Sequence, residues 1–583
     1  MKQVKKRKLK IGRIIIALIV FIVLVFVLFM LFKGTKKLIA KESVKYLASD
    51  SYNVTLYDYN NDNKELKENT KVVRGSEVKA KTDDKINKDG NNYIKITLDN
   101  ESYYVLEENL VDKKEDAVKE KYIYVRTPAS VLEDLDNPKI VDQGSKGEKM
   151  EVLSYDSIDK DGKVNTYKVK TDDNNEGYIY GKYIELTEEE AKKNYEAEKY
   201  DEIHSKIKNS YGGGDAIDLD FYPVEKASFE DNKMPNAVYS LYLNGGVIGS
   251  VDAYIEYAKT TKINAFVVDI VDDTAISYPS DVMKEISPTS YEKAINSVED
   301  YKNAIQKIKD AGFYVIGRIT VFKDSYYVTD HPENAISSKA TGEPFKHNSA
   351  YWPSAYSRDV WYYKVALAKE AVEWFGFNEI NYDYVRFPDR MMSVENSVNL
   401  HNNYEESKVQ AIQRFVQYAK DELHKVNAYV SIDVFGESTN GSYTTAYGQY
   451  WPAISNVADV ISGMPYPDHF SNGYYGINEP WNHPYELMYN WATEAMKRQE
   501  ECPTPAVVRT WIQAYDVMTY VDSNGIDYNA ENVAKEIEGL YDAGAMGGYI
   551  TWNSGSNLSK YKLQKGAFDR DYYKEYNNGD NNE

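Results

Sequence analysis

Between residues 237 and 552, short apolar runs of the β type alternate with segments whose apolar residues recur at helical spacing. The predicted strands are 237–242, 265–270, 314–319, 379–385, 429–435, 457–464, 506–511 and 547–552, and the predicted helices are 251–260, 298–311, 360–374, 409–425, 485–498 and 530–543. Eight strands with helical crossovers favour an α/β fold of the (β/α)8 TIM-barrel type over an open doubly wound sheet. We place this barrel domain at residues 233–565.

Residues 43–113 and 118–187 have a different pattern, in which short β-type runs are separated by Asp, Asn and Gly turns. This pattern predicts two small all-β modules. Tyr122-Ile-Tyr-Val-Arg126 and Glu176-Gly-Tyr-Ile-Tyr180 in the second module are similar to bacterial SH3-like modules, and Tyr103-Tyr-Val-Leu106 gives the first a weaker similarity. Neither module holds a catalytic constellation, so each is interpreted either as a spacer or as a contact to the cell wall or another partner.

Residues 188–214 are charged, with helical spacing that ends in Tyr211-Gly-Gly-Gly214. They predict a helical connector followed by a hinge-like loop. Such a connector implies few contacts between the small modules and the barrel. Residues 576–583 are rich in Asn, Asp and Gly, which predicts a disordered tail.

A basic N-terminus precedes an uncharged run of nineteen residues from Ile14 to Phe32, which is long enough to span a bilayer. The run ends in Lys33-Gly-Thr-Lys-Lys37, without a small-x-small cleavage site. We therefore interpret residues 1–37 as a cytoplasmic tail and a retained transmembrane signal-anchor. Because basic blocks stay on the cytoplasmic side, the expectation is a single-pass protein of the cell membrane whose C-terminal domains are extracellular.

Charge narrows the choice of partners. Ten of the 70 Lys and Arg residues lie in residues 1–37, so the rest of the chain holds 60 basic and 91 acidic residues, a net charge of −31. Such an exterior repels nucleic acid and anionic polymers and favours neutral or cationic partners, or it simply keeps a secreted protein soluble. The single cysteine, Cys502, suits a bacterial exterior without disulfides.

The predicted strand within Gly376-Phe-Asn-Glu-Ile-Asn-Tyr-Asp-Tyr-Val-Arg-Phe-Pro-Asp389 carries acids on one side. Alternation along a strand places Glu379, Asn381 and Asp383 together. A strand in an α/β fold is usually covered on both faces, so acidic side chains that point inward are expected to have a functional role. Pro388 cannot continue a sheet, which places Asp383 near the carboxyl end of its strand, where TIM-barrel enzymes have their active sites.

Further acids follow neighbouring strands: Asp269, Asp272 and Asp273 after the second, Asp433 on the fifth and Glu437 just beyond it. Paired carboxyl groups at one site can divide the work of catalysis, with one group ionised and the other protonated. We take Asp383 as the ionised group, with Arg386 as the positive charge that lowers its pKa. Asp433 is the first candidate for the acid and Glu437 the second; a hydrogen-bonded supporting role is the alternative for each of these carboxyls.

Asn381-Tyr-Asp-Tyr-Val-Arg-Phe-Pro388 resembles the signature of a bacterial family of inferred glycoside hydrolases with a TIM-barrel domain, formerly a domain of unknown function. The resemblance runs from about Met234 to Leu558. It also rests on Asp269-Ile-Val-Asp-Asp273, Ser431-Ile-Asp-Val-Phe-Gly436, Met464-Pro-Tyr-Pro467 and Thr551-Trp-Asn553. The resemblance implies the barrel fold and a glycosidase activity.

Aromatic and polar side chains near the predicted strand ends are candidates for sugar binding, because flat rings stack on pyranoses and polar tips bind hydroxyls. The substrate-binding candidates are Asp269, Asp273, Arg386, Tyr466, His469, Trp511, Gln513 and Trp552, and further rings nearby are Trp352, Tyr382 and Tyr384. With 54 tyrosines in the chain, core packing is the alternative for any single ring.

Other chemistries lack their signals. The seven His are scattered and the chain has no His-Glu-x-x-His, so the usual metal-hydrolase spacing is missing. It also has no Gly-x-Ser-x-Gly, no Gly-x-Gly-x-x-Gly after the first barrel strand and no Walker-type loop, so the usual signals of a serine nucleophile and of nucleotide binding are missing too. We therefore expect no metal and no cofactor, with metal ligation by the aspartates around Asp272 as the alternative. Two hypotheses follow. One is a membrane-anchored extracellular glycoside hydrolase that cleaves a surface or cell-wall polysaccharide with two carboxylates; the other is a non-catalytic carbohydrate-binding receptor or scaffold.

Overall fold

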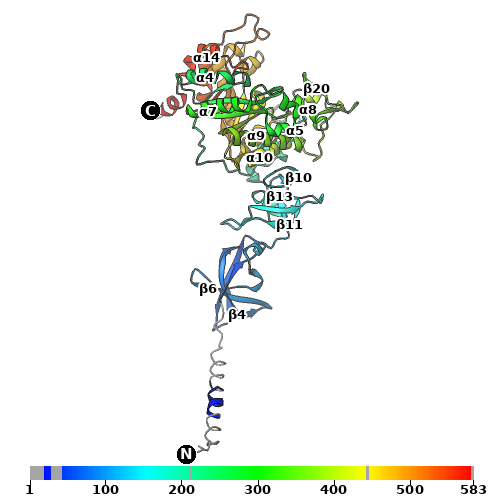
Figure 1. Ribbon diagram of the computed structural model, residues 1–583, viewed down its shortest axis with the longest axis vertical. Coiled ribbons are helices and arrows are strands. Elements are labelled where there is room, and N and C mark those ends of the chain that lie inside the picture. Colours follow the sequence, from blue (N-terminus) through cyan, green and yellow to red (C-terminus); the bar gives the residue numbers. More distant parts are fainter. Residues whose placement is uncertain (1–18, 26, 28–41, 209–211, 441–445, 580–583) are drawn as a thin grey trace, which may run out of the picture. The chain divides into compact units, whose positions relative to one another are not determined.

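The computed structural model describes residues 19–25, 27, 42–208, 212–440 and 446–579 (Figure 1). The predicted transmembrane run, residues 14–32, lies outside this part of the chain except for residues 19–25 and 27, which are helical. Within the described residues, no helix is both long and apolar enough to cross a membrane.

The first all-β module is an antiparallel sheet of seven strands in the order β3-β2-β6-β5-β4-β1-β7. Its strands are β1 (Ser43–Leu47), β2 (Asn53–Asn60), β3 (Glu65–Val73), β4 (Glu77–Lys88), β5 (Asn91–Leu98), β6 (Glu101–Leu106) and β7 (Leu110–Val111). Alternate side chains of these strands form its core, which includes Val54, Leu56, Ile94 and Ile96. The period of two that predicted strands here is therefore the period of burial.

A second sheet of seven strands has the order β10-β9-β13-β12-β11-β8-β14. Its strands are β8 (Tyr122–Val125), β9 (Ala129–Leu132), β10 (Ile140–Gly144), β11 (Lys149–Tyr155), β12 (Thr166–Lys170), β13 (Glu176–Tyr180) and β14 (Ile184–Glu185). The chain divides into two compact units, one of residues 1–123, 151–168 and 180–182 and one of residues 124–150, 169–179 and 183–583. The SH3-like character of both modules stays a prediction.

Within the second unit, the loops on either side of β9 contact the barrel helix α10 (Lys408–His424). The hydroxyl of Tyr418 donates to the Pro138 carbonyl at 2.9 Å, and the amide of Gln417 donates to the Pro128 carbonyl at 2.9 Å. The prediction of few contacts between the small modules and the barrel is therefore wrong for this part of the second module. Charge along the connector is visible in the sequence, whereas pairs nearly 300 residues apart are not.

The connector is helical as predicted, in α2 (Glu188–Lys192) and α3 (Ala197–His204). It is not a free tether, because the buried His204 ring stacks on Phe221 with 3.6 Å between ring centroids and its Nδ1 lies 2.8 Å from the Tyr450 hydroxyl. At the other end of the domain, helix α16 (Tyr572–Gly579) covers the first four residues of the predicted disordered tail, so that prediction is wrong through Gly579.

The third sheet is the predicted barrel. Its parallel strand segments follow the order β26-β25-β24-β22-β18-β16-β15-β28-β27. They are β15 (Val238–Leu243), β16 (Ala265–Asp272), β18 (Tyr314–Thr320), β22 (Glu379–Asp383), β24 (Tyr429–Phe435), β25 (Val460–Met464), β26 (Val507–Val508), β27 (Thr510–Gln513) and β28 (Gly548–Trp552). Only Arg509 separates β26 from β27, and its N–H donates to the Ile461 carbonyl at 3.1 Å. The nine segments thus occupy eight strand positions in a nearly closed parallel barrel, consistent with a TIM barrel.

Helices connect these strands in the α/β manner, and Figure 1 shows them in green to red around the barrel. They are α4 (Val251–Ala258), α5 (Asp281–Ile286), α6 (Pro288–Glu292), α7 (Val298–Asp310), α8 (Ser325–Asp330), α9 (Arg358–Phe375), α10, α11 (Trp451–Val457), α12 (Pro484–Gln499), α13 (Ala530–Asp542), α14 (Leu558–Leu563) and α15 (Lys565–Phe568). The predicted strand 457–464 begins only at Val460, because Pro452 at the first turn of α11 starts a helix that runs through Val457.

The barrel interior is polar in layers. Deepest, the fully buried Arg509 pairs with Glu379 at 2.7 Å. One layer higher, the Asn381 amide donates to Asp433 at 2.8 Å, and the layer above it holds Asp383. Glu379, Asn381 and Asp383 all point inward, as alternation along the strand predicts.

Candidate active site

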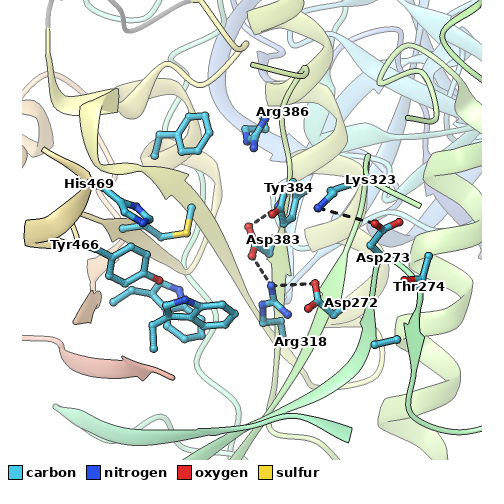
Figure 2. A pocket seen from close by; sticks show the side chains of 15 residues that line it. Asp272, Asp273, Thr274, Arg318, Lys323, Asp383, Tyr384, Arg386, Tyr466 and His469 are labelled. Atoms are coloured by element: carbon cyan, nitrogen blue, oxygen red, sulfur yellow. Dashed lines mark hydrogen bonds and ion pairs between the residues drawn. The ribbon is translucent and has the colours of Figure 1, made fainter. Parts of the chain in front are cut away.

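A cavity of about 460 Å³ lies at the carboxyl ends of the barrel strands (Figure 2). Its walls are Asp272, Asp273, Thr274, Ala275, Arg318, Lys323, Asp383, Tyr384, Arg386, Phe435, Met464, Tyr466, His469, Trp511 and Trp552. Loops and strand ends meet at this face of a TIM barrel, which is where such barrels place their active sites. The cavity therefore gathers several of the predicted residues from strands far apart in sequence.

Arg318 on β18 is the centre of the charge network. Its guanidinium lies 2.6 Å from Asp383, 2.8 Å from Asp269 and 3.5 Å from Asp272. Burial alone would lower the pKa of Arg318, but the surrounding carboxylates of Asp272, Asp269 and Asp383 raise it well above its ordinary value. Arg318 is thus a permanent positive charge that holds these acids around it.

Asp383 ends β22 and reaches the cavity, with 10% of its side chain exposed. One carboxylate oxygen accepts from Arg318 and the other accepts from the backbone N–H of Tyr384 at 2.6 Å. Tyr384 has φ 53°, a left-handed conformation that costs a bulky residue roughly 1–3 kcal/mol. The backbone thus turns sharply just after Asp383, and the turn directs an N–H at its carboxylate.

Asp433 on β24 has no exposed surface and does not line the cavity. One of its carboxyl oxygens accepts from the Asn381 amide and from the Trp511 indole N–H, each at 2.8 Å. Burial raises the pKa of Asp433 well above its ordinary value, and the charge of Asp383 raises it further. Two neighbouring acids therefore have different environments: Asp383 is paired with a cation, whereas Asp433 favours its protonated form.

The predicted aromatic candidates Tyr466, His469, Trp511 and Trp552 do line the cavity. Figure 2 shows Tyr466 and His469 on the side of Asp383 that faces away from Asp272 and Asp273. A ring wall therefore faces an acidic wall across the Asp383–Arg318 pair. That arrangement can hold a sugar by stacking on one side and by hydrogen bonds on the other.

The remaining predicted site residues lie in several places. Asp273 lines the cavity, and its carboxylate accepts from the Ser325 N–H at 3.0 Å. Asp269 is buried beside Arg318, and its carboxylate accepts a hydrogen bond from the Tyr242 hydroxyl. Burial raises the pKa of Asp269 to about 6, although the charge of Arg318 opposes that shift. Gln513 is fully buried and does not line the cavity.

Arg386 lines the cavity but does not pair with Asp383. Its guanidinium lies 2.7 Å from Asp389 and 4.1 Å above the Phe435 ring. The proposed role of Arg386 as the cation beside Asp383 is therefore wrong, and Arg318 occupies that place. Glu437, on the turn η9 (Gly436–Thr439), lines a neighbouring cavity instead of this one.

Sequence reasoning missed Arg318 and Lys323. The available signal was a single Arg inside the otherwise apolar run Tyr314–Thr320, where a charge is expected only if it is paired. In the described part of the chain, no group of three or more His, Cys, Asp or Glu side chains is arranged to hold a metal ion. Of the acids around Asp272, Asp269 and Asp272 itself pair with the Arg318 guanidinium, and Asp273 lies 3.9 Å from the Lys323 ammonium.

Comparisons with known proteins bear on this site. A family model described as "Putative glycosyl hydrolase domain" matches residues 237–558, close to the range expected from the motif at 381–388. No curated protein matches the chain in sequence.

Several solved structures are similar to parts of the chain. A hypothetical protein from Ruminiclostridium thermocellum ATCC 27405 is 33% identical, with 33% of this chain and 97% of that chain covered and a TM-score of 0.29. The glycoside hydrolase domain of PgaB (BpsB) from Bordetella bronchiseptica is 11% identical, with 57% and 99% covered and a TM-score of 0.40. A class V chitinase from Pseudomonas fluorescens Pf-5 is 13% identical, with 57% and 99% covered and a TM-score of 0.35.

Proposed function

Because the chain belongs to the family described as "Putative glycosyl hydrolase domain", we propose that its barrel is a membrane-anchored extracellular glycoside hydrolase that cleaves a surface or cell-wall polysaccharide by a two-carboxylate mechanism. The observation that carries this proposal is Asp383, a carboxylate that reaches the cavity while a fully buried arginine lies 2.6 Å away. The anchor rests on the apolar run 14–32 and the basic residues before it.

Asp383 supplies the negative charge of the mechanism. Cleavage of a glycosidic bond passes through a transition state with positive charge at the anomeric carbon. A carboxylate held by Arg318 and the Tyr384 N–H is fixed in place before the reaction, so it stabilises that charge without reorganising. It acts as the nucleophile or as the base for a water molecule.

Asp433 is the proposed proton source. Pairs of acids whose pKa values are pushed apart by their surroundings divide the ionised and protonated roles between them. Burial and the charge of Asp383 keep the proton on Asp433. Since Asp433 has no exposed surface, proton transfer to the leaving oxygen requires a movement that exposes its carboxyl group to the cavity, or else the role falls to Glu437.

The burial of Asp433 favours a second candidate function. A barrel whose second carboxyl stays buried would bind a glycan without cleaving it, as a carbohydrate-binding receptor or scaffold. The two functions differ in one measurable property, the release of new reducing ends from the bound glycan.

We expect the kcat/KM of glycan hydrolysis to fall as the pH rises through the pKa of Asp433. The acid must carry its proton, so activity is present below that pKa and lost above it. In Asp433→Asn, kcat/KM should fall by roughly 100- to 10,000-fold on natural glycosides and much less on aryl glycosides with activated leaving groups. The measurement is the pH profile of kcat/KM on both kinds of substrate.

Glu437→Gln is the matched variant for this profile, because it removes a carboxylate of the neighbouring cavity without changing its size. It should keep the alkaline limb. If instead the limb vanishes in Glu437→Gln and persists in Asp433→Asn, the proton belongs to Glu437 and the assignment of Asp433 is refuted.

A further inference from the structure

A second cavity, of about 440 Å³, adjoins the first. Its lining residues are Asp389, Arg390, Phe435, Gly436, Glu437, Tyr447, Met464, His469, Phe470, Ser471 and Tyr474. Three of these, Phe435, Met464 and His469, also line the cavity that contains Asp383. The two cavities therefore share a wall and are compartments of one cleft.

The rim between the compartments is fixed by charge and by stacking. Arg386 belongs to the first compartment and Asp389 to the second, and their side chains lie 2.7 Å apart. The Arg386 guanidinium also covers the shared Phe435 ring at 4.1 Å from its centroid. This ion pair therefore joins a residue of the first compartment to a residue of the second.

The second compartment is lined by rings. Tyr447 packs edge-on against Phe435 with 5.0 Å between ring centroids, and Phe470 packs edge-on against Tyr474 at 4.8 Å. Gly436 lets this wall close tightly, because a Cβ there would lie 2.9 Å from the Met464 carbonyl oxygen and 3.2 Å from the Phe470 ring. Aromatic rings at the edge of a cleft provide the flat apolar faces on which pyranose rings stack.

Carboxylates lie among these rings. Glu437 interacts with the Tyr447 hydroxyl, and Asp389 is already neutralised by Arg386. Carboxylates accept hydrogen bonds from sugar hydroxyls, so rings and acceptors together suit a neutral pyranose. The volume of each compartment falls within the roughly 300–1,000 Å³ of pockets that hold drug-sized ligands, so each is large enough for a sugar unit.

Resting on the proposed function, we propose that the second compartment binds neutral sugar units of the substrate beyond the unit at Asp383. The enzyme then recognises a run of the polysaccharide, not a single terminal sugar. In this arrangement Glu437 binds a sugar hydroxyl and is not the proton donor. Hydrolysis should consequently become more efficient as the oligosaccharide becomes long enough to fill both compartments.

The test uses reducing-end-labelled oligomers of N-acetylglucosamine (β-1,4), glucose (β-1,4) and glucose (α-1,4), each from two to six units. For the series that is cleaved, we expect the kcat/KM of the wild type to rise by about 3- to 10-fold for each ring-stacked unit added. Phe470→Ala should lower the ratio of kcat/KM for the longest to that for the shortest oligomer by about the same factor, through KM.

Tyr489→Ala is the matched control, because Tyr489 is an exposed ring on α12 outside both compartments, and it should keep the wild-type ratio. Glu437→Gln, which preserves shape, should also lower the ratio. Melting curves confirm that each variant is folded.

The possible outcomes distinguish the inference about the second compartment from the proposed glycosidase function on which it rests. Equal kcat/KM for all lengths, or a wild-type ratio in both Phe470→Ala and Glu437→Gln, overturns the inference and leaves the glycosidase proposal standing. A Glu437→Gln protein that loses kcat equally at every length also overturns it, because Glu437 would then act on the reacting bond. No cleavage of any oligomer overturns the function and the inference together.

Discussion

Replacing Asp383 by Asn is expected to lower glycan turnover by about 100- to 1,000-fold. The substitution preserves the shape of the side chain but removes the charge that stabilises the oxocarbenium-like transition state. Binding of the glycan should remain, since the ring wall of Tyr466 and His469 is unchanged. The measurement is kcat on a cleaved oligosaccharide, together with the dissociation constant from titration calorimetry.

Asp459→Asn controls for the loss of a buried carboxylate in general. Asp459 precedes β25 at the amino end of the strand and accepts from His424 and from the Val430 N–H, both far from the cavity lining. It should lose stability and keep its turnover. An Asp383→Asn protein with wild-type turnover would remove Asp383 from the reaction.

Replacing Arg318 by Met should lower the free energy of unfolding by about 3–5 kcal/mol. Arg318 is the ion-pair partner of both Asp269 and Asp383, and Asp269 is itself buried. Without the guanidinium, these carboxylates are left as buried charges with no cation, which costs far more than the loss of a surface pair. Urea unfolding of the full chain and of the variant measures the difference.

Two further variants make this result specific. Lys323→Met removes a partly exposed cation 3.9 Å from Asp273, so it should change the unfolding free energy by about 0–1 kcal/mol. Adding Asp269→Asn to Arg318→Met should recover part of the lost stability, because one uncompensated charge disappears. An Arg318→Met protein as stable as the wild type would show that the network does not depend on this arginine.

Strand alternation and a short sequence motif were sufficient to predict which side chains of β22 face the barrel interior and to which family the chain belongs. Alternation along 379–383 placed Glu379, Asn381 and Asp383 inside the barrel, and the contacts of all three lie there. The motif at 381–388 led to the family whose model matches residues 237–558. Each of these inferences needs only neighbouring residues.

The charge network could not be predicted in the same way. Arg318 meets Asp269 from one neighbouring strand and Asp383 from the other, so its role depends on strand register and not on the sequence around it. Arg386, three residues after Asp383, was the nearer choice along the chain, yet its guanidinium turns to Asp389. Closeness in sequence was a poor guide to pairing at the cavity.

The burial of the candidate acids could not be predicted from the sequence either. Asp433 points inward as alternation predicts, but it is fully buried, does not line the cavity, and accepts a hydrogen bond from the Trp511 indole. Glu437 comes four residues later and reaches the adjoining compartment. Strand alternation gives the direction of a side chain, whereas its exposure depends on the large rings contributed by other strands.

The most direct test of the central claim is the release of reducing ends from purified bacterial wall glycan and from the oligosaccharide panel by the wild-type protein, followed by mass spectrometry and compared with Asp383→Asn. We predict new reducing ends with the wild type and, with the variant, retained binding but almost no release. Glycan binding by both proteins without release by either would contradict a hydrolase and leave a carbohydrate-binding barrel.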